Sequence, residues 1–535
     1  MKIKEIGLLI LLLIPAVLAL FRPGFFGASD EMHIAWLQQM DQAVREGQIP
    51  PRYVSDLSFG FGYPLFNFIF PLPYYLGELF HVVGLSLVDS IKAVFIFSLI
   101  GSGITMYVLM RKLSGKWLGM AAAVLYVYSP YRSTEVYVRG ALGEAMSFVF
   151  LPLIIYFIIK FSENLKKKYV FAGSMSLMGL ILTHNIIAYM FVPLVFVFGA
   201  IILRKQIMAL MMMFLGGLLG SIYFWLPALL DSKLMKYETV FNFFDHFPTI
   251  KQLLTPYWGY GASVPGNYDG ISFFIGEINL IVLAIIVVFL IFRFSKLSIR
   301  IKQILIWSLC LIIVSGIMMN FRSTWLWQHL PLIAYFQFPW RFLLMVVFGT
   351  ALVVAGFQYF KYLKIWAILI IVVAIGLNIS RFKPHDFLNR TDNYYLNRYI
   401  PIPTPSQEYL SLKEEYLRLP KASEIRPTQN YDRVYPKNNA IKDVRLINNL
   451  DARIIVETDS EIVLNYNKYY FPGWRGTIDG KKLVLVAGSP YGQIQFLVPS
   501  GKHEIVIKYR ETGFNIFLDL ISLLTIGVCI YFLVW

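Results

Sequence analysis

Long apolar runs alternate with short polar segments along most of the chain. A membrane-spanning helix needs about 20 predominantly apolar residues, and runs of roughly this length predict twelve spans. The predicted spans are 6–21, 89–110, 117–130, 141–159, 169–184, 186–203, 207–229, 271–292, 303–319, 341–360, 363–379 and 513–534. The pattern therefore predicts a polytopic α-helical membrane protein.

The segment between the first two spans, 22–88, is too long for a simple turn. Apolar residues recur at helical spacing over 32–48, which predicts a helix lying along the membrane interface. Residues 66–80 mix aromatic side chains with proline, a composition typical of the headgroup zone. They predict a re-entrant or interfacial helix, because a full span here would invert every later loop.

Polar residues dominate 380–512, and apolar and polar residues alternate in short runs from about residue 442. Asp479-Gly480 separates two such runs, and Asp-Gly in this position indicates a β-hairpin. The segment is predicted to form a β-sandwich after an irregular connector. The predicted organisation is a transmembrane domain over 1–379 with its external loop 22–88, a connector over 380–440, a β-sandwich over 441–512 and a final transmembrane helix over 513–535.

Composition agrees with a membrane protein. Hydrophobic residues make up 57% of the 535 residues and charged residues 15%, with a mean hydropathy of +0.61. Soluble domains are about 45–50% apolar and about 25% charged. The net charge of +16 does not indicate a nucleic-acid partner, because the basic residues lie in short loops and not on one soluble unit.

Alternate connections between the predicted spans are short and basic, as the positive-inside rule requires of cytoplasmic loops. This pattern predicts a multi-pass protein of the plasma membrane with cytoplasmic N- and C-termini and an extracytoplasmic β-domain. The first span also resembles a signal peptide, but Arg22-Pro23-Gly24 is a poor cleavage context, so an uncleaved anchor is expected. Cys310 and Cys529 fall inside predicted spans, which excludes a disulfide in the external domain. The basic connections contain Lys2 and Lys4; Arg111, Lys112 and Lys116; Lys160, Lys166, Lys167 and Lys168; Arg204 and Lys205; Arg293, Lys296, Arg300 and Lys302; and Lys361 and Lys364.

Candidate catalytic residues follow the first span. Asp30, Glu31 and His33 lie within a few residues of the predicted bilayer boundary, where charged groups are costly and a functional reason is the default hypothesis. If a helix has begun, Asp30 and His33 share one face, and a carboxylate beside a histidine can act as general base on a sugar hydroxyl. The alternative is that Ser29 or Asp30 only caps the helix.

Other ionisable residues also occur at the predicted external ends of spans, so they are expected to line one outward-opening cavity. Arg139 and Arg341 have the planar guanidinium that suits phosphate oxygens. Structural alternatives remain open for each residue. Glu144 could pair with Arg139 or Arg132, His184 could be a satisfied boundary histidine, and Arg341 could extend to the headgroups.

Several well-known sites are absent from the sequence. It contains no GxxxxGK[ST] loop, no HExxH and no GxSxG motif, and no span carries a row of charges. These absences argue against a P-loop ATPase, a zincin protease, an α/β-hydrolase and a voltage sensor.

Motifs along nearly the whole chain resemble known membrane proteins. The motifs Asp30–His33 with Phe61–Phe66, Tyr137–Glu144 and Phe338–Phe342 resemble the 6-pyruvoyl-tetrahydropterin-synthase-related bacterial membrane proteins and the neighbouring YfhO family. The pterin name implies no activity, because the chain has no zinc-histidine pterin synthase site. The external domain resembles that of the YfhO family through Tyr470–Arg475, Asp479-Gly480 and Val498–His503.

Acids in the first external loop, a basic polytopic core and a C-terminal external domain resemble the GT-C superfold of glycosyltransferases. The resemblance implies a lipid-linked sugar donor, a polyprenyl-phosphate sugar, and an envelope glycan, lipid or protein as acceptor. It implies Asp30 or Glu31 as the base, assisted by His33, with Arg139, Glu144, His184 and Arg341 binding substrate and its phosphate. A divalent cation is left open as cofactor. The alternatives are a lipid or glycan transporter or flippase, and a non-catalytic envelope scaffold.

Overall fold

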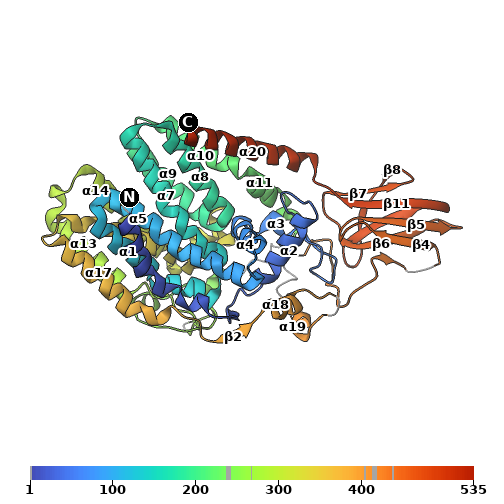
Figure 1. The fold of residues 1–535 in the computed structure, drawn as a ribbon, viewed down its shortest axis with the longest axis horizontal. Helices are drawn as coiled ribbons and strands as arrows, with labels where there is room; N and C mark the ends of the chain where they lie inside the picture. The colour runs from blue at the N-terminus through green and yellow to red at the C-terminus, as the bar shows by residue number, and fades with distance from the viewer. Residues whose placement is uncertain (1–2, 237–241, 267, 403–404, 412–418, 437–438) are drawn as a thin grey trace.

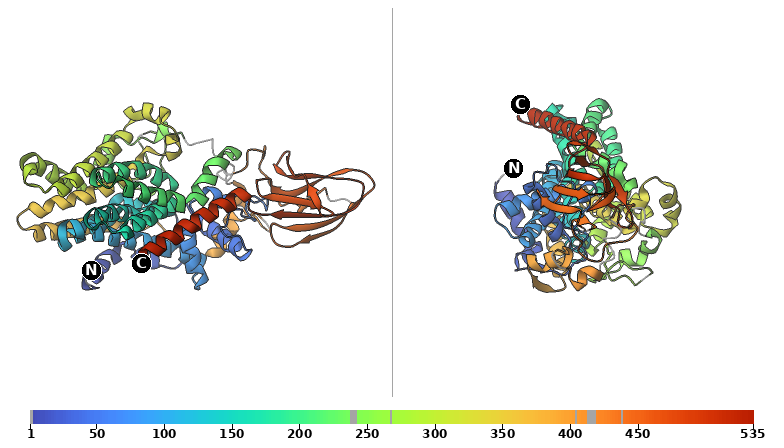
Figure 2. Two further views of the ribbon diagram at one scale, coloured as in Figure 1. Left: turned by 90° about the horizontal axis from the view of Figure 1, so that it is seen from above. Right: turned by 90° about the vertical axis from the view of Figure 1, so that its right-hand side faces the viewer.

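The apolar runs form an array of helices, and the strands of the C-terminal region project from one end of it (Figures 1 and 2). The computed structural model describes residues 3–236, 242–266, 268–402, 405–411, 419–436 and 439–535. Both labelled chain ends lie on the helical part of the molecule, away from the sheets (Figure 1). The chain therefore consists of many apolar helices with a sheet-rich C-terminal region.

Each predicted span overlaps a helix, but the predicted count of twelve is not confirmed. In the described part of the chain, eight helices are long and apolar enough to cross a membrane, or nine if α10 and α11, bent by 67°, form one span. The α1 helix has 11 residues and α8 has 17, and α5 contains two predicted spans. The long helices are α1 (Ile3–Leu13), α5 (Leu87–Val127), α7 (Leu142–Asn164), α8 (Lys167–Thr183), α9 (Asn185–Ile202), α10 (Ile207–Gly220), α11 (Ile222–Asp231), α13 (Glu277–Arg293), α14 (Ile299–Met318), α16 (Leu343–Val353), α17 (Leu363–Asn378) and α20 (Gly513–Val534).

The α5 segment is a pair of helices joined at a sharp turn. Gly115 has φ 84° and ψ 175°, a conformation that only glycine adopts readily. A Cβ on Gly119 would lie 3.0 Å from the backbone nitrogen of Arg111, and one on Gly103 would lie 3.2 Å from the side chain of Val127. A straight helix keeps such residues far apart, because it rises about 1.5 Å per residue. The two halves of α5 therefore pack side by side.

The basic loops gather at one end of the helical domain. Lys112 pairs with Glu163 at 2.8 Å, and Arg300 donates to Ser162 Oγ at 2.9 Å. These contacts bring the loops at 111–116, 160–168 and 293–302 together. The arrangement agrees with the alternation of basic loops in the sequence.

The first external loop forms a β-strand and three helices, β1 (Phe25–Phe26), α2 (His33–Arg45), α3 (Leu65–Phe68) and α4 (Leu72–Val82). The predicted helix over 32–48 is present, but its apolar residues Ile34, Leu37 and Met40 are fully buried inside the protein. The helix packs on α4 and α5 through this face. Its apolar stripe therefore faces protein and not lipid.

The aromatic residues that follow are also buried. Phe61, Tyr63 and Tyr74 are all fully enclosed, whereas Leu79 and Val82 at the end of α4 are 58% and 68% exposed. The interfacial or re-entrant helix over 66–80 stays a prediction. The C-terminal region covers the part around Phe61. The Tyr469 N–H donates to Phe61 O at 3.0 Å, and Tyr53 Oη donates to Tyr469 O at 2.9 Å.

The C-terminal strands form two antiparallel sheets, in the orders β3-β6-β10-β9 and β4-β5-β11-β7-β8. Ile454 and Ile505 of one sheet share a buried core with Leu464 and Phe496 of the other, so the sheets pack face to face. Asp479-Gly480 joins β7 to β8 as predicted, with both φ angles positive. The strands are β3 (Val434–Tyr435), β4 (Ile441–Leu446), β5 (Ala452–Thr458), β6 (Ile462–Tyr469), β7 (Trp474–Ile478), β8 (Lys481–Leu483), β9 (Val486–Gly488), β10 (Gln493–Val498) and β11 (Gly501–Tyr509).

The connector between the helices and the sheets returns to the first external loop. Its strand β2 (Phe387–Arg390) pairs with β1, and its helix α18 (Asp392–Tyr399) packs on α2. The carboxylate of Asp392 accepts the backbone N–H groups of Leu87 and Val88 at 3.0 and 2.9 Å. These bonds satisfy free donors at the start of α5. A second helix, α19 (Gln407–Ser411), follows in the connector.

Arg52 links the first external loop to the C-terminal helix. Its Nε lies 2.8 Å from Glu511 Oε1 and its Nη2 lies 2.8 Å from Asp519 Oδ1. Its Nη1 donates to Asn67 Oδ1 and to Tyr223 O, each at 3.1 Å. The guanidinium is buried. One side chain thus fixes α11 and α20 to the loop.

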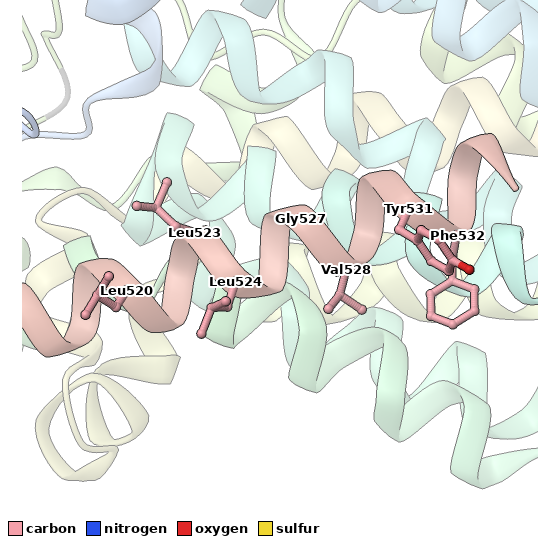
Figure 3. Close-up of a pocket in the computed structure, with 7 residues that line it drawn as sticks. All are labelled: Leu520, Leu523, Leu524, Gly527, Val528, Tyr531 and Phe532. Carbon is pink, nitrogen blue, oxygen red and sulfur yellow. The ribbon is translucent and has the colours of Figure 1, made fainter.

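The α20 helix packs on α8, α10 and α11 along one side. Its other side is apolar and exposed, and a shallow cavity of about 440 Å³ runs along it, lined by Leu520, Leu523, Leu524, Gly527, Val528, Tyr531 and Phe532 (Figure 3). All of these residues come from α20 itself. This face has the composition of a lipid-facing surface.

Candidate functional site

Glu144, in the first turn of α7, lies between two arginines. Arg139 donates through Nη1 to Glu144 Oε2 and through Nη2 to Oε1, both at 3.0 Å. Arg341 donates through Nε to Glu144 Oε1 at 2.8 Å, from a position 197 residues further along the chain. Glu144 is 1% exposed. The structure therefore brings three of the candidate residues into one buried cluster.

Local structure holds Arg139 in place. It is the last residue of a π-helical turn, Thr134–Arg139, which ends at Gly140 with φ 69°. Arg139 also donates to Glu135 Oε1 at 2.7 Å, and its guanidinium lies 4.7 Å from the centre of the Trp340 ring. A π-turn is a frequent feature of functional sites because it redirects side chains.

Arg341 is held by the segment before it. Its Nη1 donates to Phe336 O at 2.6 Å and to Gln337 Oε1 at 3.0 Å. The side chain is buried and paired with Glu144. The alternative that Arg341 extends to the lipid headgroups is therefore wrong for this conformation.

His184 lies next to the same carboxylate. Its Nε2 is 4.0 Å from Glu144 Oε1, and its ring stacks on Phe70 with centroids 5.0 Å apart. Its Nδ1 accepts the Ile187 N–H at 3.3 Å, so the residue also caps α9. The buried His184 therefore has a structural role at the edge of the cluster.

Arg132 does not pair with Glu144, contrary to one alternative. Its Nη1 donates to Ala145 O at 3.0 Å and its guanidinium lies 3.8 Å from the centre of the Phe148 ring. The expected pair of Glu144 with Arg139 is present instead.

The cluster combines two guanidiniums with two carboxyl groups. Arg139 and Arg341 face Glu144, and Glu135 Oε1 lies 2.7 Å from Arg139 Nη1. Burial raises the pKa of Glu135, while the guanidinium of Arg139 acts in the opposite direction. Guanidinium groups bind phosphate through parallel N–H bonds, so the two arginines are the groups of this cluster that suit an anion.

Asp30 lies beside this cluster through its backbone. Its N–H donates to Arg139 O at 2.8 Å, and the Ser29 N–H donates to Val138 O at 3.2 Å. The first external loop therefore runs directly alongside the π-helical turn. The side chain of Asp30 is half-buried.

Two expectations about Asp30 are wrong. The α2 helix begins at His33, so Asp30 precedes it and the two residues do not share a helical face. The N-cap position is Met32 and no side chain caps it, so neither Ser29 nor Asp30 has that role. The His33 Nδ1 hydrogen-bonds with Tyr74 Oη at 2.6 Å, which ties α2 to α4.

Glu31 is buried and faces the connector. Its Oε1 lies 3.3 Å from Arg390 Nη1, its Oε2 lies 4.0 Å from Arg398 Nε, and Oε1 accepts the Ala28 N–H at 3.3 Å. Burial raises the pKa of Glu31, while the Ala28 N–H and the two guanidiniums act in the opposite direction. The sequence reasoning missed both arginines, because the connector shows no motif that distinguishes them from surface arginines.

A cavity of about 650 Å³ opens next to these acids. Its lining includes Ser29 and Glu31, which flank Asp30, and Val138 from the π-helical turn. Tyr260 and His385 form the opposite part, with ring centroids 5.1 Å apart. The cavity offers carboxylate, hydroxyl and aromatic groups to a polar ligand. Its remaining lining residues are Gly27, Ala28, Gly261, Ala262 and Asp386.

Arg390→Ala is expected to make stability more sensitive to pH. Without this guanidinium the pKa of Glu31 rises further. The free energy of unfolding is therefore lower at every pH at which the carboxyl of Glu31 is charged. The loss should be small below pH 4.5, the ordinary pKa of glutamate, and grow to about 1 kcal/mol as pH rises through the folded pKa. Unfolding of the detergent-solubilised protein across this range measures it.

Arg398→Ala is the matched control, because Arg398 is farther from Glu31. Its effect should have the same sign and be smaller. A loss of stability in Arg390→Ala that does not change with pH would contradict the view that the loss comes from the ion pair with Glu31.

Comparison with known proteins identifies a family. The sequence model of the 6-pyruvoyl-tetrahydropterin synthase related domain, a membrane protein family, matches residues 66–383. Among solved structures, the cryo-EM structure of arabinofuranosyltransferase AftD from Mycobacteria matches with a TM-score of 0.45 and 11% identity, over 74% of this chain. This chain spans 28% of that structure. No curated protein matches the sequence. Because the family match covers more than half of the chain, the protein belongs to the membrane family of the 6-pyruvoyl-tetrahydropterin synthase related domain.

Proposed function

We propose that the protein is a membrane glycosyltransferase, which transfers a sugar from a polyprenyl-phosphate donor to a cell-envelope acceptor on the extracytoplasmic face. The observation that supports this is the meeting of Arg139 and Arg341 beside the loop that carries Asp30. Acids and guanidiniums from distant parts of the chain are thereby combined at the predicted membrane boundary.

The proposed reaction uses these groups in two roles. Asp30 accepts the proton of an acceptor hydroxyl, whose oxygen then forms a bond to the anomeric carbon of the donor sugar. The bond from that carbon to the phosphate oxygen breaks, with inversion, and polyprenyl phosphate leaves. Arg139 and Arg341 stabilise the charge that develops on the departing phosphate.

Glu31 remains the alternative base. It lines the cavity beside Asp30, but its ion pairs with Arg390 and Arg398 stabilise the carboxylate and make it a weaker base. The bond of His33 to Tyr74 favours a role in shaping the loop over a role in proton transfer.

The proposal contains no metal-dependent step. Across the described residues, no group of three or more His, Cys, Asp or Glu side chains is placed to hold a metal ion. A divalent cation stays open as cofactor, and the proposed steps are written for the carboxylate and guanidinium groups.

A panel of radiolabelled polyprenyl-phosphate sugars, offered to the purified protein in lipid nanodiscs with envelope extracts as acceptors, tests the function. We expect release of free polyprenyl phosphate from at least one donor together with label in an acceptor fraction. Retention of every donor intact, in preparations that are monodisperse and folded, would speak against the transferase.

A non-catalytic scaffold is the second candidate. One observation favours it, because Glu144 already pairs with both arginines and such a pair has a purely structural explanation. Binding of donor lipids without turnover would support it, and turnover would exclude it.

A further inference from the structure

Two connections on the β-sheet side of the helices expose large apolar side chains. One contains α12 (Ile250–Leu254) and the other contains α15 (Thr324–His329). Most exposed apolar surface in this protein lies on spans, so exposure in short polar-flanked connections needs its own explanation. The exposed fractions are 41% for Phe244, 63% for Ile250, 64% for Phe321, 64% for Trp325, 45% for Leu332 and 40% for Tyr335.

The exposed surface continues from the lipid-facing side of a predicted span. Ile313 and Ile317 on α14 are 60% and 51% exposed. Phe321 follows three positions after the last residue of α14, and Trp325 lies four positions further on. Exposed apolar side chains therefore occur both at the end of the helix and in the connection that follows it.

Buried contacts fix the connections in this position. Trp327 is enclosed, and its Nε1 donates to Met318 O at 3.0 Å. Phe247 contacts the edge of Phe321 with ring centroids 5.9 Å apart, and Tyr189 Oη donates to Pro331 O at 2.9 Å. In α15 the opposite face is already packed through Trp327, so Trp325 stays on the outside.

The chemistry of the surface matches the headgroup layer of a bilayer. Trp and Tyr are enriched where hydrocarbon meets water, because one part of each ring system is apolar and another part is polar. Lys251 and Arg322 are exposed on the same two connections and suit lipid phosphates.

We infer that these two connections form an interfacial anchor, which lies in the headgroup layer of the leaflet on the β-sheet side. The name interfacial anchor denotes Phe244, Ile250, Phe321, Trp325, Leu332 and Tyr335. This inference does not depend on the proposed transferase activity. It commits the surface to lipid and not to another protein.

The anchor also sets the depth of the arginine cluster. Tyr335 is followed by Phe336 and Gln337, whose oxygen atoms hold the guanidinium of Arg341. A fixed depth for Tyr335 therefore also fixes the depth of the two oxygen atoms that hold Arg341.

Site-specific fluorescence measures the depth directly. Cys310 and Cys529 are first replaced by serine, and single cysteines are then introduced as Phe321→Cys and Trp325→Cys and labelled with an environment-sensitive dye. Ile313→Cys reports the hydrocarbon, and Val484→Cys, which is 72% exposed on the β-domain, reports water. Each labelled protein is examined in nanodiscs containing anionic lipid, with quenchers in water, on the headgroup and deep in the acyl chain.

Dyes at 321 and 325 should be blue-shifted and several-fold brighter than the dye at 484, and quenched most by the headgroup-level quencher. Their depth should be about 5–10 Å into the boundary between headgroups and acyl chains. Quenching from water equal to that at 484 would overturn the inference. So would quenching equal to that at 313, because the connections would then lie within the hydrocarbon.

Discussion

Glu144→Gln is expected to lower the free energy of unfolding by about 3–5 kcal/mol, because two buried guanidiniums then lose their carboxylate. Arg139 and Arg341 both contact Glu144 within 3.0 Å. Glutamine has the same shape but cannot neutralise either charge. Denaturant unfolding of the detergent-solubilised protein, followed by tryptophan fluorescence, measures the loss.

Two further variants make this test specific. Glu163→Gln removes an ion pair with Lys112 that is about one-third exposed, and it should change stability by less than about 1 kcal/mol. Combining Glu144→Gln with Arg341→Met removes one of the stranded charges, so the double variant should be more stable than the sum of its parts. If the stability losses of the two single variants add exactly in the double variant, the ion pair between Glu144 and Arg341 is not the cause of the loss.

Asp30→Asn is expected to reduce sugar transfer by about 10²–10⁴-fold, because an amide cannot accept the proton of the acceptor hydroxyl. The bond from the Asp30 N–H to Arg139 O is a backbone bond and survives the change. The melting temperature should therefore stay that of the unchanged protein. Initial rates at saturating donor, measured over a range of pH, report the loss.

Glu31→Gln and Asp386→Asn are the matched controls for Asp30. Asp386 lines the cavity together with Glu31 but is largely exposed, so its variant should keep most of the activity. If Glu31→Gln abolishes transfer and Asp30→Asn retains it, the base is Glu31. Full transfer by both variants would contradict the proposal that one of these two carboxylates is the general base.

The sequence allowed part of the candidate site to be predicted. Residues at the predicted external ends of different spans were expected to meet, and Arg139, Glu144, His184 and Arg341 do lie together. The prediction is possible because alternating topology brings such ends to one side of the membrane. It does not depend on knowing which helices are neighbours.

The first external loop was harder to predict because its environment is tertiary. The aromatic residues around Phe61 have a composition typical of the headgroup zone, but β6 covers them through Tyr469. The sequence contains no local signal that a strand some 400 residues later would supply this cover. The start of α2 was predicted within one residue, but the capping side chain suggested for it is absent, because Met32 occupies the N-cap position.

Arg52 was overlooked, although a signal for it exists. Asp519 lies within the predicted span 513–534, and an acid inside a span requires a partner. Searching the loops for an isolated arginine would have led to Arg52, which follows Pro50-Pro51 without a neighbouring acid. Which residue pairs with Asp519 depends on the fold. That Asp519 needs a partner can be derived from hydropathy alone.

The pairing of Arg52 with Asp519 also has a consequence for biosynthesis. The two residues are separated by 467 positions, and the guanidinium is buried in the finished protein. During translation the loop emerges long before Asp519 leaves the ribosome and enters the bilayer. The packing of this loop on the helices can therefore be completed only after insertion of α20, when the guanidinium of Arg52 gains its carboxylate partners and can be buried.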